Sequence, residues 1–220
     1  VTKIRVTQTF EVPVAGLREQ KKAQTRAAIA IAAADLFARD GYAVVTMAQV
    51  ATAAGVSDQT LYNYFPTKES LVFDQSELFE QTLTSAVLDR ADGVDLIDAY
   101  AYWLRAFILG DSARRAMTHP GGMPRLVATS DPLRRMLLDV AHGVAGRLAE
   151  RLHEVEALPA PTAGALADAM LAIMVRTTVS IGAARDAPAL AEITERAAAA
   201  IDAIRPLLSP SSWSRPAPRG

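Results

Sequence analysis

The sequence of 220 residues contains no cysteine and only 6% aromatic residues, and its apolar runs are short. The lack of cysteine excludes disulfide bonds, thiolate zinc sites and thiol nucleophiles, and it favours a cytoplasmic location. Runs such as residues 169–175 fall short of the roughly 20 apolar residues that a membrane span needs. No basic start is followed by an apolar signal core. We therefore expect a soluble protein with no membrane partner.

The chain also lacks a net charge of either sign, because 23 basic residues face 24 acidic ones. Eight basic and six acidic residues fall in residues 1–70, against 15 and 18 in residues 71–220. Binding to nucleic acid must therefore rest on local charge, although a solvated N-terminal tail explains the basic excess equally well. The basic residues near the N-terminus are Lys3, Arg5, Arg18, Lys21, Lys22 and Arg26.

The short motifs of common catalytic sites are missing. His119, His142 and His153 do not form the His-Glu-x-x-His pattern of zinc proteases. The sequence contains no phosphate-binding P-loop, no Gly-x-Gly-x-x-Gly and no Gly-x-Ser-x-Gly elbow. We therefore expect neither an enzyme nor a cofactor or metal site.

Alanine is the residue in excess, with 43 copies against 12 glycines and 12 prolines. Alanine has the highest intrinsic helix propensity, and only residues 1–14 show a β-like pattern. We therefore predict an all-α fold of about nine helices.

Three helices are predicted near the N-terminus. The first covers residues 21–41, and the second begins at Thr46, which forms a capping box with Gln49. Gly55 ends the second helix, and Ser57 is a good N-cap for a third that ends near Phe65. Two short helices joined by a tight glycine turn are typical of a helix-turn-helix.

Six further helices follow, the first of which is a long helix over residues 68–90 capped by Thr67. The next five cover residues 94–109, 111–117, 132–156, 161–185 and 188–207, and proline opens the last three. Residues 119–124 are predicted as a loop. The predicted domains are a flexible arm (1–20), a helix-turn-helix domain (21–67), a helical body (68–208) and a disordered tail (209–220).

The N-terminal pattern resembles the DNA-binding region of TetR-family transcriptional regulators over residues 24–73. The long first helix together with the Thr-Leu-Tyr-x-x-Phe-x-x-Lys run is specific to that family. The resemblance implies a DNA-binding head joined to a body that binds a ligand and dimerises. The matching residues are Ile29, Ala33, Leu36, Phe37, Gly41, Tyr42, Thr46, Met47, Val50, Ala51, Ala54, Gly55, Val56, Ser57, Thr60, Leu61, Tyr62, Asn63, Tyr64, Phe65, Lys68 and Glu69.

Residues 58–64 form the predicted recognition helix, which fits a major groove. Gln59 and Asn63 share a face, and their amides can pair with adenine. The hydroxyls of the other candidates suit phosphate oxygens, and the resemblance implies that Lys68 anchors phosphate. The DNA-binding candidates are Thr46, Ser57, Gln59, Thr60, Tyr62, Asn63, Tyr64 and Lys68.

Some of these residues have a second interpretation. Tyr62 or Tyr64 can pack against the first helix, and Thr46 is above all a cap. Asp58 departs from the expected pattern, because an acid near DNA is repelled by phosphate. It can stabilise the helix N-terminus or accept from cytosine. The N-terminal arm either reaches a minor groove or stays disordered.

The last two helices carry apolar stripes lined by alanines, and we expect them to form a homodimer interface. Core of the same chain is the alternative and takes part of each stripe. The stripe residues are Leu166, Ala169, Ile173, Thr177 and Ile181, then Leu190, Ile193, Ala197, Ile201, Ile204 and Leu208.

Aromatic and methionine side chains in the body predict an adaptable apolar pocket, which His119, Arg125 or Arg176 would provide with a polar group. Such residues are also common in an ordinary core, and we expect about half of them to line the pocket. The ligand-binding candidates are Tyr100, Trp103, Phe107, Met117, His119, Met123, Met136, Met170, Met174 and Thr177.

Together these features predict a dimeric repressor that binds a palindromic double-stranded DNA operator and is released by a small, largely apolar effector. The alternative is an all-helical ligand-binding or interaction protein without specific DNA binding. Asp58 and the weak overall charge favour the alternative, whereas Lys68 and the Thr-Leu-Tyr run oppose it.

Overall fold

The computed structural model describes residues 16–74, 76–110 and 119–208, and these form helices and no strand. The all-α prediction is therefore confirmed. The predicted helix 111–117 with Met117, the first 15 residues and the tail 209–220 lie outside the described residues. The elements are α1 (Leu17–Asp40), α2 (Met47–Ala54), α3 (Asp58–Tyr64), α4 (Lys68–Val72), α5 (Ser76–Leu88), α6 (Leu96–Leu109), α8 (Met123–Thr129), α9 (Asp131–Glu156), α10 (Ala160–Ala183), α11 (Ala187–Ile204) and the short 3-10 turn η1 (Arg205–Leu208).

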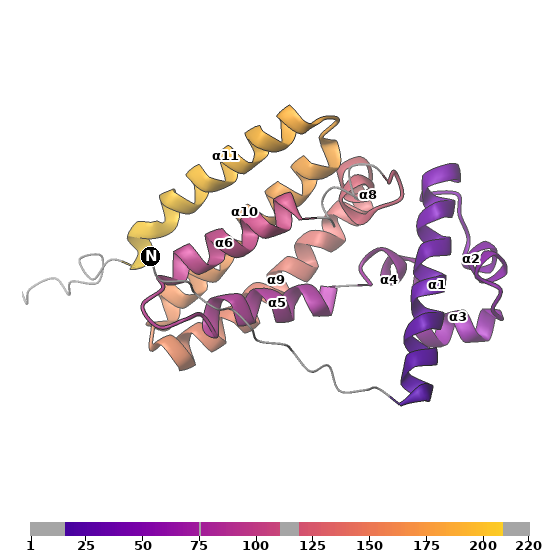
Figure 1. Cartoon of the computed structure of the whole chain (residues 1–220), viewed down its shortest axis with the longest axis horizontal. Coiled ribbons are helices and arrows are strands. Elements are labelled where there is room, and N and C mark those ends of the chain that lie inside the picture. The colour runs from indigo at the N-terminus through magenta and orange to yellow at the C-terminus, as the bar shows by residue number, and fades with distance from the viewer. Residues whose placement is uncertain (1–15, 75, 111–118, 209–220) are drawn as a thin grey trace, which may run out of the picture.

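Helices α1 to α3 form a unit that we call the head, and α5 to α11 form the body (Figure 1). The apolar face of α1 is buried in the head, where Ile29 and Ala33 are fully covered. Leu61 of α3 and Phe65 after it are also fully buried. Burial of these side chains holds the outer face of α3 toward solvent.

Two predicted boundaries at the head are wrong. Helix α1 begins at Leu17, so the last four residues of the predicted arm 1–20 are helical. The predicted helix 68–90 is divided into α4 and α5, because α4 ends at Val72 with Phe73 as its C-cap. Asp74 and Ser76 favour helix ends, since their side chains compete for backbone hydrogen bonds. The break buries the Phe73 side chain.

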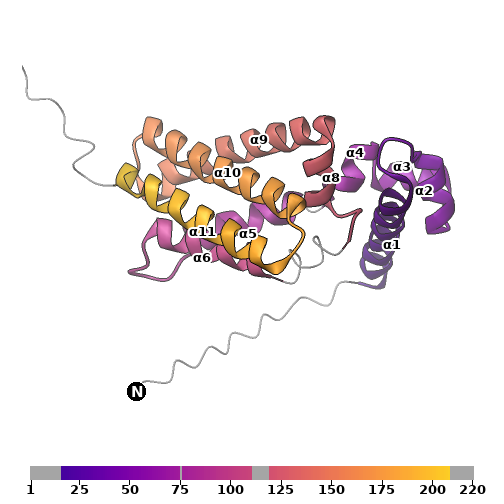
Figure 2. The ribbon, with the colours of Figure 1, turned by 90° about the horizontal axis from the view of Figure 1, so that it is seen from above.

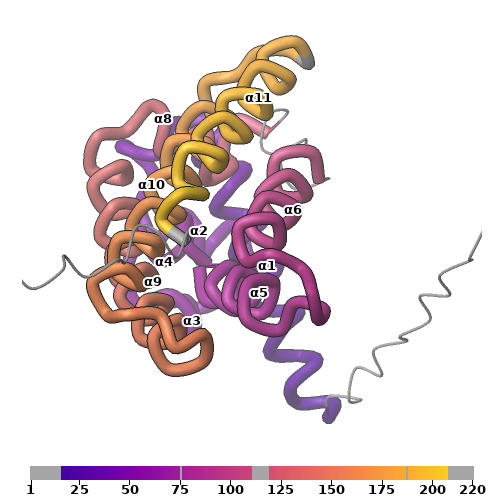
Figure 3. Tube along the Cα trace, turned by 90° about the vertical axis from the view of Figure 1, so that its left-hand side faces the viewer, coloured from indigo at the N-terminus to yellow at the C-terminus, as the bar shows by residue number. Residues whose placement is uncertain are grey.

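The body is built around α10, which packs against α6, α8, α9 and α11 (Figures 2 and 3). Helix α10 is also the one described helix long and apolar enough to cross a membrane by length and composition. Because 56% of its most apolar window is buried inside the fold, that property is explained by its place in the core.

Prolines open several helices of the body. Helices α9, α10 and α11 each begin one residue before the proline that the sequence analysis placed first. The predicted loop 119–124 is wrong at its end, because Met123 and Pro124 start α8. A proline fits the first turn of a helix, where its missing N–H has no partner to lose. The turn before α8 lies against α1 of the head at Gly121.

Candidate nucleic-acid interface and effector cavity

The turn between α2 and α3 is held by side-chain caps. Thr46 Oγ1 accepts from the Gln49 amide at 3.3 Å, while the Thr46 amide donates to Gln49 Oε1 at 2.8 Å. The predicted capping box is therefore confirmed. Gly55 ends α2 in the left-handed conformation at φ 67°, which favours glycine, and Ser57 Oγ then accepts from the Thr60 amide. These contacts set the angle at which α3 leaves α2.

The solvent face of α3 presents an amide pair. Gln59 Nε2 donates to Asn63 Oδ1 at 3.1 Å, and both side chains are exposed. Tyr62 is 48% exposed beside them. The pair leaves Gln59 Oε1 and Asn63 Nδ2 for other partners, so the face offers both an acceptor and donors. This is the combination that an adenine edge requires.

The remaining DNA-binding candidates lie at the edges of this face. Thr46 and Ser57 are exposed at the starts of α2 and α3, whereas Thr60 and Tyr64 are half-buried. Tyr64 packs against the hydrophobic core. Asp58 is exposed in the first turn of α3, where a negative charge stabilises the helix dipole.

Lys68 begins α4 and holds the loop between α1 and α2. Its Nζ donates to the Ala43 carbonyl at 3.4 Å and lies 4.3 Å from the centre of the Tyr42 ring. Burial lowers the pKa of Lys68, while the neighbouring Glu69 acts in the opposite direction. The Tyr42 hydroxyl donates to Glu69 at 3.0 Å. Lys68 is thus positioned at the head surface by several contacts.

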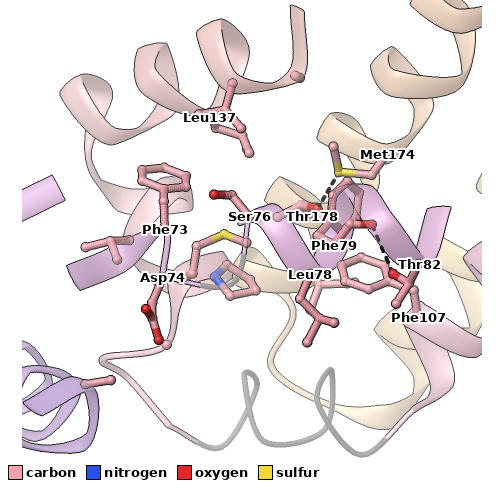
Figure 4. A pocket seen from close by; sticks show the side chains of 18 of the residues that line it. Phe73, Asp74, Ser76, Leu78, Phe79, Thr82, Phe107, Leu137, Met174 and Thr178 are labelled. Atoms are coloured by element: carbon pink, nitrogen blue, oxygen red, sulfur yellow. Dashed lines mark hydrogen bonds between the residues drawn. The ribbon is translucent and has the colours of Figure 1, made fainter. Parts of the chain in front are cut away.

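A cavity of about 730 Å³ lies between the head and the body. Its volume is in the range of ordinary small-molecule sites. Helix α1 forms one wall, and the α4–α5 connection and the body helices form the others (Figure 4). The lining residues include Ala30, Ala34, Phe37, Phe73, Asp74, Ser76, Leu78, Phe79, Thr82, Trp103, Phe107, Gly121, Met123, Leu137, Met174 and Thr178.

Four ligand-binding candidates line this cavity, namely Trp103, Phe107, Met123 and Met174. The other described candidates are Tyr100, His119, Met136, Met170 and Thr177, and they are absent from the described lining. Tyr100, Met170 and Thr177 are buried in the core, and Met136 packs against it.

Tyr100 is part of the packing of the body. The Tyr100 hydroxyl donates to the Met170 carbonyl at 2.6 Å, which joins α6 to α10. Burial raises the pKa of Tyr100 well above its ordinary value. The hydroxyl therefore stays protonated and serves as a structural donor.

The proposed polar partners of a ligand have structural contacts or face solvent. Arg125 Nη1 donates to the carbonyls of Gly182 and Ala184, at 2.8 and 3.3 Å. Arg176 is exposed. His119 Nε2 lies 3.1 Å from Asp35 Oδ1 on α1. Over residues 16–74, 76–110 and 119–208, no group of acidic or histidine side chains is arranged to hold a metal ion.

The part of the cavity that α1, α4 and α5 provide was not predicted from the sequence. Phe37 was named only among the residues that carry the family resemblance, and Phe73, Asp74 and Phe79 fell within the predicted long helix. Thr178 follows Met174 by one helical turn, so the periodicity of α10 contained a signal for it. The α4–α5 break, which the sequence analysis did not predict, turns Asp74 toward the head.

The head and the body touch closely around this cavity. Arg26 of α1 pairs with Asp74 at 2.6 Å, and its guanidinium lies 4.8 Å from the centre of the Phe65 ring. A Cβ on Gly121 would lie 1.8 Å from the Ala34 carbonyl oxygen of α1. The backbone before α8 therefore rests directly on the backbone of α1.

Much of the stripe expected to form a dimer interface is buried within the single chain. Leu166, Ile173 and Ile181 of α10 are buried, as are Ile193 and Ile201 of α11. The side chain of Leu208 lies outside the described residues. The exposed positions of these two helices include the small residues Ala165, Ala172, Ala191 and Ala198.

Comparisons with known proteins bear on the head and the fold. Residues 29–74 match the family model of bacterial regulatory proteins of the tetR family, which confirms the resemblance in this region. Among solved structures, the chain is similar to Salmonella enterica GusR, with a TM-score of 0.51 and 22% identity over 81% of this chain and 96% of that chain. A protein from Mesorhizobium loti, described as a TetR-family transcriptional regulator, has the same score and identity over 83% and 96%. At such identity the likeness shows the fold. No curated protein matches the chain in sequence.

Proposed function

We propose that this protein, whose residues 29–74 match the tetR family of bacterial regulatory proteins, is a cytoplasmic DNA-binding repressor that acts as a homodimer. In this proposal residues 21–67 bind a palindromic operator, and residues 68–208 bind an effector and dimerise. A small, largely apolar molecule in the cavity releases the DNA. The proposal includes no catalytic activity, cofactor or metal.

The outer face of α3 is the observation that carries this proposal. Gln59 and Asn63 are exposed side by side, while Leu61 and Phe65 are buried beneath them. A helix placed in this way enters a major groove with its amides toward the base edges. Thr46, Ser57, Thr60, Tyr62, Tyr64 and Lys68 surround this face and supply hydroxyls and one ammonium to phosphates.

If the protein binds a palindromic operator, it is expected to bind as a homodimer. Two heads about 34 Å apart would contact successive major grooves on one side of the duplex. Exposed alanines on α10 and α11 allow the same helices of a second chain to approach closely. An isologous contact of this kind closes with two-fold symmetry.

The cavity supports the proposed release by a ligand. Because α1 forms one of its walls, a ligand there contacts the head directly. The bound state then favours a head spacing that does not suit the operator. The α4–α5 connection and Arg26 would transmit the change, in place of the continuous helix that the sequence predicted.

Salt-dependent binding to a nonspecific DNA duplex tests the DNA-binding proposal. A protein that neutralises phosphates loses affinity steeply as salt is added, because counterions are released on binding. We expect such a fall for the wild-type protein. No binding at low salt would contradict the proposal and favour an all-helical ligand-binding or interaction protein.

A further inference from the structure

One carboxylate lies in the part of the cavity wall that the structure describes. Asp74 is the one ionisable side chain in the described lining, and only 17% of it is exposed. In Figure 4 it lies at the end of the cavity near the α4–α5 connection, away from Thr82 and Phe107. A carboxylate in a largely apolar site requires a cationic partner. Arg26 supplies that partner through a single contact, from Nε to Oδ1.

One threonine of the lining offers an acceptor to a ligand. Thr82 is exposed, and its Oγ1 donates to the Phe79 carbonyl at 3.0 Å (Figure 4). Since this hydroxyl proton already has an acceptor, the group presents lone pairs to the cavity. Thr178, whose Oγ1 donates to Met174 Sδ at 3.4 Å, is fully buried. Together, Asp74 and Thr82 suit a ligand that donates hydrogen bonds.

Aromatic rings form the opposite part of the wall. The Phe79 and Trp103 rings meet edge to face with centroids 5.1 Å apart, and Trp103 stacks on Phe107 at 5.9 Å. Such rings pack against an apolar or aromatic ligand body. Their faces also attract cations and disfavour anions.

We propose that the effector is an apolar or aromatic molecule with one protonated amine, which pairs with Asp74 while its apolar body lies against Phe79, Trp103 and Phe107. This proposal rests on the proposed function and names the chemical class of the effector. An anionic ligand of the same size would place its charge beside a carboxylate and is disfavoured.

The amine competes with Arg26 of the head. Two cations at one carboxylate repel each other, so the amine weakens the pair between α1 and the α4–α5 connection. Loss of this pair frees the head to take another position relative to the body. The charge of the effector is therefore the feature that links binding to release.

Three probes on one scaffold test this proposal, namely 1-naphthylmethylamine, 1-naphthylmethanol and 1-naphthoate, with affinities measured by calorimetry on the full chain without DNA. We expect the amine to bind about tenfold more tightly than the alcohol, and the alcohol more tightly than the acid. Asp74→Asn should abolish the preference for the amine and leave the affinity for the alcohol unchanged. Glu77→Gln, which removes an exposed acid of α5 outside the described lining, is the matched control.

The variant Arg26→Gln distinguishes the effect of the Asp74 carboxylate from the effect of the ion pair. It breaks the same pair as Asp74→Asn but keeps Asp74 charged, so it should bind the amine at least as tightly as the wild type. Equal loss of amine binding in both variants, a preference for the acid, or no amine binding at millimolar concentration overturns the proposal. Because DNA is absent, these outcomes are distinct from a failure of DNA binding in the salt experiment.

Discussion

The hydroxyl of Thr46 shows how one side chain positions the helix-turn-helix. It caps α2, and replacing an N-cap threonine by alanine costs about 1 kcal/mol. We expect Thr46→Ala to lower the free energy of unfolding by this amount in urea titrations. Thr52→Ala on the same helix is the control, because the Thr52 hydroxyl only bonds back to the Ala48 carbonyl. Equal losses in both variants would contradict the capping role.

Lys68 and Asn63 are assigned different tasks at the DNA. Lys68→Ala should weaken binding alike across sequences and reduce the slope of log affinity against log salt by about 1. Asn63→Ala should change which sequences are preferred, because in the proposed complex its exposed amide would face the bases. Binding to a panel of duplexes at several salt concentrations measures both effects. The reverse pattern would overturn the assignment.

At the residue scale, the sequence could predict the roles of residues that act through local contacts. Thr46, Ser57 and Gly55 act within a few residues of their own position, so their roles follow from short patterns. Whether a residue lines the cavity depends on contacts with residues that are distant in the sequence. Trp103 lines it while Tyr100 on the same helix is buried, and helical spacing alone does not distinguish the two.

Among the elements, the end of α9 is joined to the segment that follows α5 by an ion pair with two contacts. Arg90 donates to both carboxylate oxygens of Glu156, at 2.6 and 2.8 Å. These bonds lower the pKa of Glu156 from its ordinary value of 4.5. The carboxylate therefore contributes stability above pH 4.5, and this contribution is lost as the pH falls through the lower pKa of the folded state.

Glu156→Gln tests this pH dependence. We expect it to lower the free energy of unfolding by roughly 1–2 kcal/mol at pH 7, since a charged hydrogen bond in a half-buried site is replaced. The difference from wild type should shrink as the pH falls below 4.5. Urea unfolding at several pH values measures it, with Glu150→Gln on the exposed side of α9 as the control. A difference independent of pH would rule out the ion pair as its source.

The contact of α1 with the turn before α8 depends on a glycine. Gly121→Ala would place a Cβ 1.8 Å from the Ala34 carbonyl oxygen, so the two backbones must separate. We expect a loss of at least about 1 kcal/mol in stability together with altered DNA affinity. Gly146→Ala in α9 is the control, because its Cβ meets nothing within 4 Å and alanine favours a helix. Unaltered stability in Gly121→Ala would contradict the close packing.

Helices were easier to predict than the breaks between them. The apolar period of α1 and the prolines of α9 to α11 located these elements to within a few residues. The break after Val72 was not predicted, because residues 68–90 contain no glycine or proline to mark it. It is explained by burial of Phe73 and by the pair of Asp74 with Arg26, which are tertiary contacts.

At the scale of the whole molecule, the near-zero net charge averages two unequal parts. Residues 1–70 carry a charge of +2 and residues 71–220 a charge of −3. The head therefore has the sign that DNA requires, and the body does not. The cavity lies where these parts meet, with α1 as one wall and body helices as the others. This placement lets one bound molecule affect both parts.

Selection of bound fragments from random double-stranded DNA tests the central proposal most directly. If α3 enters the major groove from a two-fold dimer, the enriched sequences will be palindromic, with half-site centres about 10 base pairs or a multiple of that spacing apart. Enrichment of no sequence, or of a single half-site without symmetry, would contradict the account of a dimeric operator-binding repressor.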